Sequence, residues 1–288
     1  MTKGGDRRVI ISADDFGLSL AVNEAVERAH IDGILSTASL MVAGEAAADA
    51  VARARRLPGL RVGLHLVVIE GPAMLDPASI ARLVGSNGQF PSDQAGLGVR
   101  YYFDPRVRRQ LRAEIAAQYL AFAATGLRLD HANAHKHMHL HPTVGRMMIE
   151  EGRRHGLCAI RIPAEPPEVM ASLGEDPSIG DRALYRWTSV LRRQARRAGL
   201  RTNDHAFGIA WTGRMTADRI LRLAPALPPG TSEIYFHPAT EADTTIAALM
   251  PGYRHADELA ALLDPAVATA LPPRVDYGAR LIATDTRG

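Results

Sequence analysis

The sequence predicts an α/β protein in which seven or eight mostly parallel strands form a distorted TIM-like (β/α) barrel. Apolar strands alternate with amphipathic helices along the chain, which is typical of a parallel sheet covered by helices. Polar residues lie at or near the C-terminal ends of four expected strands, namely Asp14, Asp15, His65, His135 and His237. These ends spread along a line in an open doubly wound sheet, whereas they converge on one mouth in a barrel. A shared site at these ends favours the barrel, with the open sheet as the alternative.

The expected strands are short apolar or β-branched runs bounded by turn residues. The first run, RVIISA, ends directly in Asp14 and Asp15, and the third contains His65 within GLHLV. The fourth strand leads into a histidine-rich stretch. In chain order we expect strands at residues 8–13, 36–42, 61–68, 127–134, 157–163, 203–207, 233–237 and near 280–283.

The expected helices carry an apolar face and have recognisable ends. Ser19 caps the first helix, and Asp104 caps a long one that has Pro105 at its first position and Gly126 after its end. The helix near residues 182–198 is expected to turn four side chains inward: Leu184, Trp187, Leu191 and Ala195. The full set of expected helices is 19–33, 46–57, 104–126, 142–155, 182–198, 216–223, 256–263 and 265–271.

We expect residues 1–288 to form a single barrel domain, because this length lies within the range of α/β barrels. Two segments near residues 70–103 and 164–181 interrupt the alternation and are expected to be long inserted loops. Cys158 is the single cysteine, which excludes a disulfide framework and fits a reducing compartment. The start of the chain lacks the apolar core of a signal peptide, and we expect a cytoplasmic protein.

The net charge is +3, and arginines cluster at residues 53–56, 106–112 and 192–197. We expect no nucleic-acid partner, because aromatic residues that would stack on bases are not interleaved with these arginines. Solvated helix faces are the first interpretation of the clusters. Peripheral contact with the inner membrane is the second, and a homodimer is an alternative to a monomer.

Residues 131–142, HANAHKHMHLHP, hold five of the eleven histidines. Side chains alternate between two faces in an extended strand, so a continued strand would place alternate residues of this run on one face. These residues are Asn133, His135, His137, His139 and His141. The simpler alternative is a polar loop that enters a helix at Pro142. Imidazole is the commonest protein ligand for metals of this kind, and we favour a metal site.

Two histidines and one carboxylate suit zinc with positions left open for water, and magnesium is the alternative. In the Asp14–Asp15 pair, one carboxylate can bind the metal while the other accepts a proton, although a single Asp here could simply cap a turn. His237, just before Pro238, is the expected general acid, with a structural role as the alternative. The chain has no Walker A loop, GxGxxG, HExxH or GxSxG motif.

In combination, several motifs resemble the YdjC-like carbohydrate deacetylases along essentially the whole chain. They are ADDFGLS, the NE of Asn23 and Glu24, STASLMVAG, VGLHL, HKHMHLHP and the late FHP. The stretches LPGLRVGLHLVVIEG, NAHKHMHLHPTV and MPGYRHADELAALL are most similar to the hopanoid-biosynthesis-associated branch of that family, HpnK.

This resemblance implies a distorted TIM-like barrel with one divalent metal ion. It implies that Asp15, His65 and His135 bind the metal and that Asp14 is the base. Relatives usually read D-S-H before the histidine run, and here Asn133 occupies the place of that Asp. The expected contacts to substrate or to the metal ligands come from five side chains: Asn133, Lys136, His137, His139 and Arg161.

The predicted function is therefore a metal-dependent hydrolase that removes the N-acetyl group from an N-acetylglucosamine-type sugar. For the hopanoid branch, that sugar is the head group of a glycosylated hopanoid lipid. Tyr101, Tyr102 and Phe103 would then form an apolar wall for the lipid or simply pack their loop onto the barrel. The alternatives are a deacetylase of soluble chitooligosaccharides and a non-catalytic metal-dependent carbohydrate- or lipid-binding protein. A metal phosphoesterase is a further alternative, but such an enzyme would need more basic side chains at the mouth of the barrel.

Overall fold

The structure is a computed structural model that describes residues 6–241 and 243–282 of the 288-residue chain. Within these residues, eight strands form one sheet in the order β6-β5-β4-β3-β2-β1-β8-β7. Every pairing between neighbouring strands is parallel. The strands are β1 (Arg7–Phe16), β2 (Thr37–Leu40), β3 (Arg61–Leu66), β4 (Leu129–Ala134), β5 (Ala159–Ile160), β6 (Arg201–Thr202), β7 (His205–Phe207) and β8 (Gly230–Phe236).

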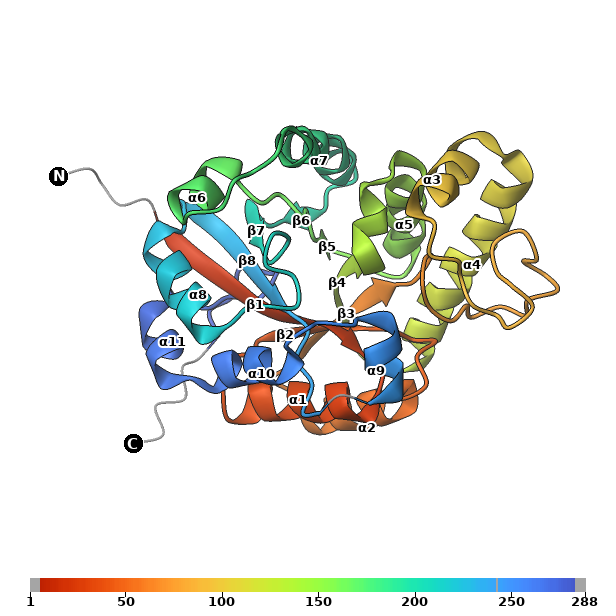
Figure 1. Cartoon of the computed structure of the whole chain (residues 1–288). Helices are drawn as coiled ribbons and strands as arrows, with labels where there is room; N and C mark the ends of the chain where they lie inside the picture. Colours follow the sequence, from red (N-terminus) through yellow and green to blue (C-terminus); the bar gives the residue numbers. More distant parts are fainter. Residues whose placement is uncertain (1–5, 242, 283–288) are drawn as a thin grey trace.

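The sheet curls into an incomplete barrel, which confirms the predicted distorted barrel and excludes the open doubly wound alternative (Figure 1). The edge strands β6 and β7 are not paired with each other. The Asn203 side chain, between β6 and β7, links the chain after β5 to β7, because its Oδ1 accepts from the Ile162 N–H and its Nδ2 donates to the carbonyls of Ile162 and His205. The Ala206 N–H also donates to the Ala164 carbonyl at 3.0 Å. Side-chain and loop contacts thus replace the missing strand pairing.

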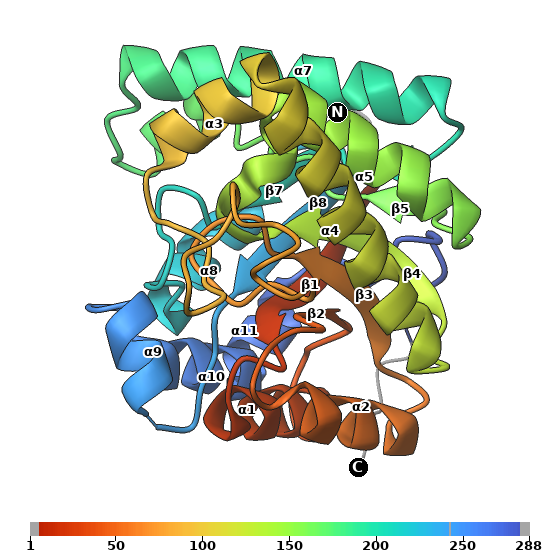
Figure 2. The ribbon, with the colours of Figure 1, turned by 90° about the vertical axis from the view of Figure 1, so that its right-hand side faces the viewer.

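Helices pack around the outer face of the sheet (Figures 1 and 2). Short 3₁₀ segments, η1 and η2, follow β4 and α8. The helical elements are α1 (Leu20–Ile31), α2 (Ala47–Arg56), α3 (Gln94–Phe103), α4 (Pro105–Ala124), η1 (His135–Leu140), α5 (Pro142–Arg154), α6 (Pro167–Ser172), α7 (Ile179–Arg197), α8 (Ala217–Leu223), η2 (Ala224–Ala226), α9 (Thr244–Leu249), α10 (His255–Leu263) and α11 (Pro265–Ala270).

The predicted helix ends follow from local hydrogen bonds. The Ser19 hydroxyl accepts from the Val22 N–H at the start of α1. At the start of α4, the Asp104 carboxylate accepts from the next two backbone N–H groups, and Pro105 occupies the first turn. Gly126 follows α4 with φ +71°, a left-handed conformation that glycine adopts without steric cost. These local signals are why the helix positions could be predicted.

Two expectations about the chain are corrected by the structure. Residues 70–103 are not a loop throughout, because α3 fills the last third and the Glu114 carboxylate binds the N–H groups of Met74 and Leu75. The expected strand near residues 280–283 is reduced to an isolated bridge at Leu281, and Ala283 lies outside the described residues. Residues 94–103 lack the regular apolar pattern that would predict a buried helix. Residues 280–283 lack the apolar run that would predict a paired strand.

Helix α7 is also less buried than its sequence predicts. Leu191 and Ala195 face inward as expected, but Leu184 is 38% exposed and Trp187 is 47% exposed. The apolar stripe is therefore continuous along the helix, while the barrel covers only its C-terminal half. Among the described residues, no helix combines the length and the apolar character needed to cross a membrane.

Candidate metal and catalytic site

The first strand ends in a bulge that sends two neighbouring carboxylates into the same region. The pairing of β1 with β2 shifts register between Ala13 and Phe16, and Asp15 takes a left-handed conformation with φ 62°. Such a conformation costs an ordinary residue about 1–3 kcal/mol and is found mostly where function requires it. Because of this turn, Asp14 and Asp15 do not point to opposite faces of the sheet as they would in a regular strand.

Asp15 meets two imidazoles from other strand ends. Its Oδ1 lies 3.2 Å from Nε2 of His65 and 3.2 Å from Nδ1 of His135. The two imidazole nitrogens lie 3.4 Å apart, and all three ligand atoms are within 4.8 Å of one another. His65 lies on β3, and His135 follows β4 directly. The predicted ligands Asp15, His65 and His135 are thus brought together at the ends of β1, β3 and β4.

The donor set fits a divalent cation. Both Asp15 oxygens are buried, and no donor within the described residues reaches them in hydrogen-bonding geometry. Burial disfavours ionisation of Asp15, but contacts with His135 and His65 outweigh it and hold its pKa well below its usual range. Burial likewise disfavours protonation of His65, yet the Asp14 and Asp15 carboxylates raise its pKa. This negative potential and two imidazole ligands are what a borderline metal such as zinc requires.

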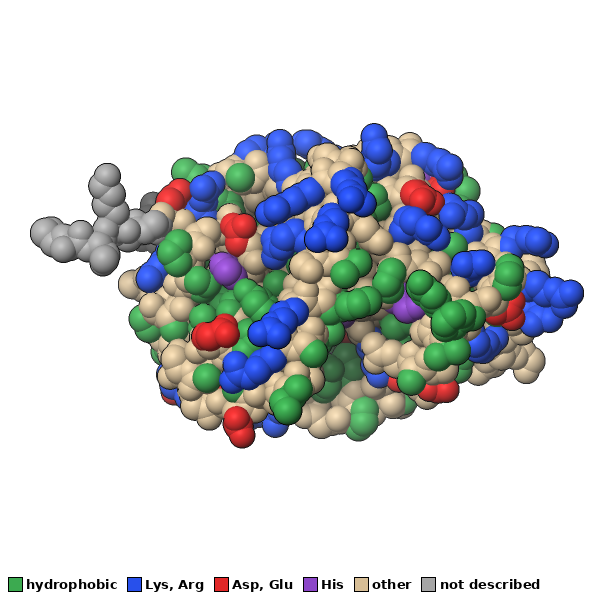
Figure 3. All heavy atoms as spheres, turned by 90° about the horizontal axis from the view of Figure 1, so that it is seen from above, with side chains coloured by type: hydrophobic (Ala, Val, Ile, Leu, Met, Phe, Trp, Pro, Cys, Tyr) green, Lys and Arg blue, Asp and Glu red, His purple; other side chains and the backbone are tan. Residues whose placement is uncertain are grey.

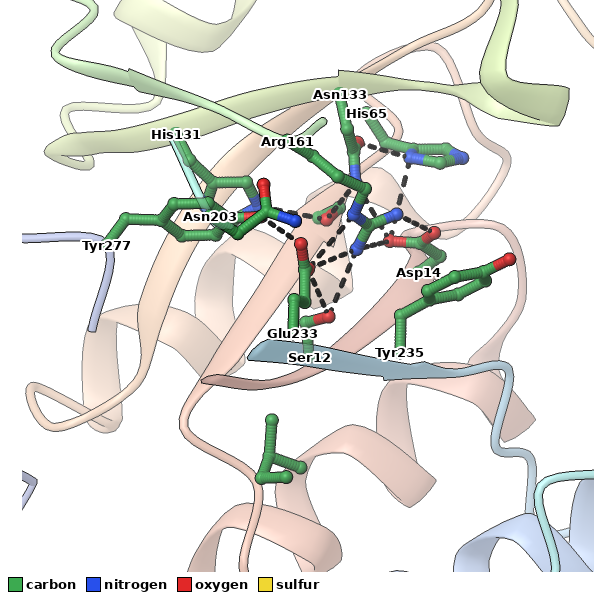
Figure 4. Close-up of polar contacts among 12 residues, drawn as sticks. Ser12, Asp14, His65, His131, Asn133, Arg161, Asn203, Glu233, Tyr235 and Tyr277 are labelled. Atoms are coloured by element: carbon green, nitrogen blue, oxygen red, sulfur yellow. Dashed lines mark hydrogen bonds and ion pairs between the residues drawn. The ribbon is translucent and has the colours of Figure 1, made fainter. Parts of the chain in front are cut away.

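Asn133 fixes the orientation of the His65 ring. Its Oδ1 lies 2.7 Å from Nδ1 of His65, and its Nδ2 donates to Asp14 Oδ1 and Ser39 Oγ, each at 3.0 Å (Figure 4). A carboxylate only accepts hydrogen bonds, so the amide nitrogen must face Asp14 and the amide oxygen must face His65. The proton of His65 is then on Nδ1, and the lone pair of Nε2 points at Asp15 and the metal position.

Further hydrogen bonds lie one layer outward, beyond Ser39. Because the Asp130 carboxylate can only accept, the proton of a neutral His131 is on Nδ1, and its Nε2 accepts from the Ser39 hydroxyl, 3.1 Å away, while Ser39 Oγ accepts from Asn133. Nδ1 of His131 then donates to Asp130 Oδ2 at 3.2 Å. These buried groups form a directed chain of hydrogen bonds that ends on a carboxylate. Outer contacts of this kind orient metal ligands and raise their basicity.

Asp14 is held by a buried arginine. Arg161 Nη1 and Nη2 bond the two Asp14 oxygens, while Nε and Nη2 bond Glu233 Oε1 at 2.9 and 2.7 Å (Figure 4). Burial disfavours ionisation of Asp14, but the charge and hydrogen bonds of Arg161 dominate and hold its pKa well below the usual range. Asp14 therefore stays ionised, and the two bonds from Arg161 fix the orientation of its carboxylate.

A pocket of about 290 Å³ opens above these groups. Its walls come from four regions: the ends of β1, β3 and β8, the turn after β4, the loop after β7, and the segment from α9 to Tyr253. His237 faces it from the end of β8, and burial lowers the pKa of this ring although the nearby Asp15 and Asp14 carboxylates oppose the shift. The lining residues are Asp14, His65, Ala134, His135, Lys136, His137, Ile209, Thr212, Tyr235, His237, Leu249, Met250, Pro251 and Tyr253.

The prediction that the four histidines of the run share one strand face is wrong. The strand ends at Ala134, and Lys136 and His137 adopt left-handed conformations with φ 49° and 54°. The imidazoles therefore diverge. His137 Nε2 lies 3.0 Å from the Tyr235 hydroxyl, whereas His139 is fully buried and its Nε2 donates to the Arg161 carbonyl at 3.1 Å. The alternation of side chains between the two faces of a strand does not continue through a turn.

The expected substrate contacts fall into two groups. Lys136 and His137 line the pocket, and Lys136 pairs with Glu70. Asn133, His139 and Arg161 are buried behind the pocket wall and are not among its lining residues. In this structure, they are placed to position other side chains of the site.

Sequence reasoning missed Glu233 and Tyr235. Both precede His237 on β8 at a spacing of two, so all three share the face that points into the barrel. Alternation along EIYFH would have identified them, because Glu233 within an apolar strand requires a buried partner. Ser39 and His131 gave no such signal, since isolated Ser and His residues in strands are common.

A family model described as YdjC-like protein matches residues 8–272. The chain belongs to the YdjC-like family. It is 30% identical over 270 residues to a carbohydrate deacetylase of Geobacillus stearothermophilus, a match that covers 93% of this chain and 94% of that protein. It is 38% identical over 135 residues to a carbohydrate deacetylase of Vibrio vulnificus. That match spans 47% of this chain and about half, 51%, of the curated relative.

Among solved structures, the fold is similar to that of a candidate cellobiose-phosphate cleavage protein from Enterococcus faecalis. The TM-score is 0.73 at 22% identity, and the likeness covers 95% of this chain and 98% of the other. At this identity the likeness shows a shared fold.

We expect Asp15→Asn to abolish binding of a divalent ion, because it removes the one anionic ligand of the three-residue cluster. Metal content after equilibrium dialysis against zinc should fall from about one ion per chain to near zero. The neighbouring Asp14→Asn variant is the matched control and should keep its ion. Equal loss in both variants would contradict the assignment of Asp15 as the ligand.

We expect Asn133→Leu to weaken metal binding about 10–100-fold, because the His65 ring loses the acceptor that fixes its tautomer. Competition with a chromophoric zinc chelator measures this affinity. Asn133→Asp restores an acceptor for Nδ1–H of His65 and should bind metal more tightly than the leucine variant. If the two variants had the same affinity, the proposed orientation of His65 would be wrong.

Proposed function

We propose that this protein is a metal-dependent carbohydrate deacetylase that hydrolyses the N-acetyl group of an N-acetylglucosamine-type sugar. Membership in the YdjC-like family and two relatives named as carbohydrate deacetylases support this proposal. The observation that carries it is the neighbouring pair Asp14 and Asp15. One carboxylate faces two imidazoles, and the other is held ionised by Arg161 at the floor of the same pocket. A protein that only bound sugar would have no use for the second carboxylate.

Asp15, His65 and His135 would hold the ion, with zinc favoured over magnesium because two of the ligands are imidazoles. When bound, a divalent ion supplies Lewis acidity, which lowers the pKa of water to about 7 and polarises a carbonyl oxygen. The protein itself supplies the groups that move protons and fix the substrate.

Asp14 is the proposed general base, and the structure indicates which of its oxygens is available. Oδ1 already accepts from Asn133 and from Arg161 Nη2, whereas Oδ2 accepts, among the described residues, only from Arg161 Nη1. A carboxylate oxygen has about two acceptor positions, so Oδ2 keeps one for a proton of the attacking water. Glu233 shares the same guanidinium, and Asp14 is therefore only partly neutralised.

The departing sugar amine must gain a proton, and His237 is the proposed acid. It lines the pocket directly after the end of β8, and its Nδ1 has no hydrogen-bond partner within the described residues. Its backbone N–H is held by the buried Glu258 carboxylate, which fixes the end of β8. The imidazole is thus positioned while one nitrogen stays free to transfer a proton.

The size and lining of the pocket bear on the identity of the substrate. The pocket volume, about 290 Å³, is at the small end of ligand sites and suits one sugar unit with its acetyl group. His137, Tyr235 and Tyr253 supply polar and aromatic groups around it. From the motif resemblance to the hopanoid-associated branch, HpnK, we propose the head group of a glycosylated hopanoid. A soluble chitooligosaccharide is the alternative substrate.

The proposed function predicts acetate release from an N-acetylglucosaminyl hopanoid in detergent, at a higher kcat/KM than from chitobiose. Removing the ion with a chelator should abolish release, and zinc should restore it. Acetate is quantified by a coupled enzymatic assay. Faster release from chitobiose would refute the hopanoid substrate but not the deacetylase. Binding of both sugars without any acetate release would favour the non-catalytic alternative.

We expect Asp14→Asn and His237→Asn each to lower kcat by about 10²–10⁴-fold while the ion stays bound, because each removes one proton-transfer group. His30→Gln changes an imidazole on α1 that does not line the pocket and serves as the comparison. Single-turnover acetate release measures the chemical step. Full activity of His237→Asn would exclude His237 as the acid, and full activity of Asp14→Asn would exclude Asp14 as the base.

A further inference from the structure

We propose that the face formed by α3, α5 and α7 docks on an anionic lipid bilayer. This surface is called the α3–α7 face below, and its residues lie outside the catalytic pocket. The inference therefore does not depend on the proposed deacetylase chemistry.

Exposed apolar side chains gather on this face. On α3 they occur at spacings of three and four, which places them on one side of the helix. On α7 they belong to the N-terminal half of the apolar stripe, which the barrel leaves uncovered. The exposed fractions are Val99 60%, Tyr102 51%, Phe103 71%, Ile179 88%, Leu184 38% and Trp187 47%. Half of the large apolar side chains that are exposed in the described part of the chain are in this group.

The two helices flank the same short stretch of chain. The Trp187 indole N–H donates to the Leu140 carbonyl at 3.0 Å, and the Tyr102 ring lies edge-on to the His141 ring at 6.2 Å between centroids. Leu140 and His141 are consecutive, so the exposed aromatic groups of α3 and α7 lie on either side of one turn. Figures 1 and 2 show both helices at the same upper end of the molecule, next to α5.

The α3–α7 face is strongly basic. Helix α7 alone carries six arginines and one acidic residue, although the net charge of the whole chain is only +3. Arg186, Arg193, Arg196 and Arg197 pair with no carboxylate of residues 6–241 or 243–282. Figure 3, which views α7 from above, shows Lys and Arg side chains crowded over this face with hydrophobic side chains among them.

A groove of about 610 Å³ runs between α5 and the C-terminal end of α7. Its only acidic lining residue, Glu150, is already paired with Arg112 at 2.9 Å. The groove therefore presents net positive charge to an anionic group. Its lining residues are Arg146, Ile149, Glu150, Arg153, Arg154, Gln194, Arg197 and Ala198.

An anionic bilayer is the one occupant that matches both properties. Arginine beside tryptophan, tyrosine and phenylalanine is the composition that binds membrane interfaces, where aromatic rings enter the head-group region and cations meet lipid phosphates. A second copy of this chain would bring two sets of unpaired arginines together, which like-charge repulsion opposes. Nucleic acid would satisfy the arginines but leave Val99, Ile179 and Leu184 exposed, since aliphatic side chains do not stack on bases.

Docking in this way would bring the pocket close to the bilayer. Gln94, at the start of α3, lies 3.4 Å through its Nε2 from the Lys136 carbonyl, and Trp187 bonds Leu140. Both contacts are made to η1, and Lys136 and His137 of η1 also line the pocket. The pocket wall and the docking surface are thus two sides of one turn.

Vesicle binding tests this proposal, and the two tryptophans make the readout local. Trp187 is 47% exposed, whereas Trp211 is 1% exposed in the core. We expect binding to vesicles of phosphatidylcholine with about one-third phosphatidylglycerol, and little binding to pure phosphatidylcholine. Lipids brominated in the acyl chain should quench Trp187, and the quenching should be lost in Trp187→Phe. Binding should weaken steeply with added salt.

Val99→Ser/Phe103→Ser/Ile179→Ser should weaken vesicle binding at least tenfold, because it removes the three most exposed apolar groups of the face. Arg193→Gln/Arg197→Gln should weaken it by about fivefold for each charge. Leu20→Ser/Ile31→Ser, on exposed positions of α1, is the matched control and should bind like the wild type. Thermal unfolding verifies that each variant is folded.

Two results would overturn the proposal. One is wild-type binding that does not distinguish anionic from neutral vesicles, or that the α1 control weakens as much as the α3–α7 variants. The other is a concentration-dependent dimer, measured by light scattering, that the Val99/Phe103/Ile179 variant dissociates in the absence of any vesicle binding. The second result would assign the face to a second copy of the chain.

Discussion

The guanidinium of Arg161 is the constraint on which the centre of the barrel depends. It is fully buried and bonds Asp14 at the end of β1 and Glu233 on β8, with Ser12 as a further partner. Burying a charge is unfavourable unless it is paired and hydrogen-bonded, and removing one partner of such a pair costs about 3–5 kcal/mol. Asp14 is therefore fixed by the same contacts that hold three parts of the barrel in register. Its orientation does not rely on substrate.

The charges around Arg161 also explain why Asp15 is suited to hold a cation. The barrel interior holds three buried carboxylates, Asp14, Asp15 and Glu233, and one buried guanidinium, which pairs with Asp14 and Glu233, so it carries excess negative charge. The Tyr277 hydroxyl stabilises the charge of Glu233 by donating a hydrogen bond to it, and the Asp14 and Asp15 carboxylates raise the pKa of His65. The left-handed turn at Asp15 separates its carboxylate from Arg161 and directs it to the two imidazoles. The left-handed turn thus keeps the proposed metal ligand apart from the proposed base, although the two residues are adjacent in the chain.

Several features of this site could be predicted from the sequence, because they depend on position along strands. Parallel strands place the residues after their C-terminal ends at one edge, so Asp15, His65 and His135 were expected to meet there. The paths of His137 and His139 could not be predicted, since they depend on left-handed residues that alternation does not reveal. The role of Arg161 could not be predicted either, because it depends on β5 lying across the barrel from β8, and this arrangement belongs to the tertiary structure. The exposure of Trp187 was mispredicted for a related reason: an apolar stripe does not specify what covers it.

Two opposite electrostatic surfaces follow from this distribution of charge. The pocket floor is acidic, whereas the arginines of α7 make the outer face basic, and η1 separates the two by a single turn. An acetylated sugar is uncharged and meets no repulsion at either surface. Its deacetylated product carries a protonated amine, which the acidic floor attracts and the basic face repels. In the proposed reaction, the bound cation would oppose this attraction by neutralising the floor. Metal binding would therefore assist release of the amine as well as hydrolysis, and the arginines would hold anionic lipid without competing for the product.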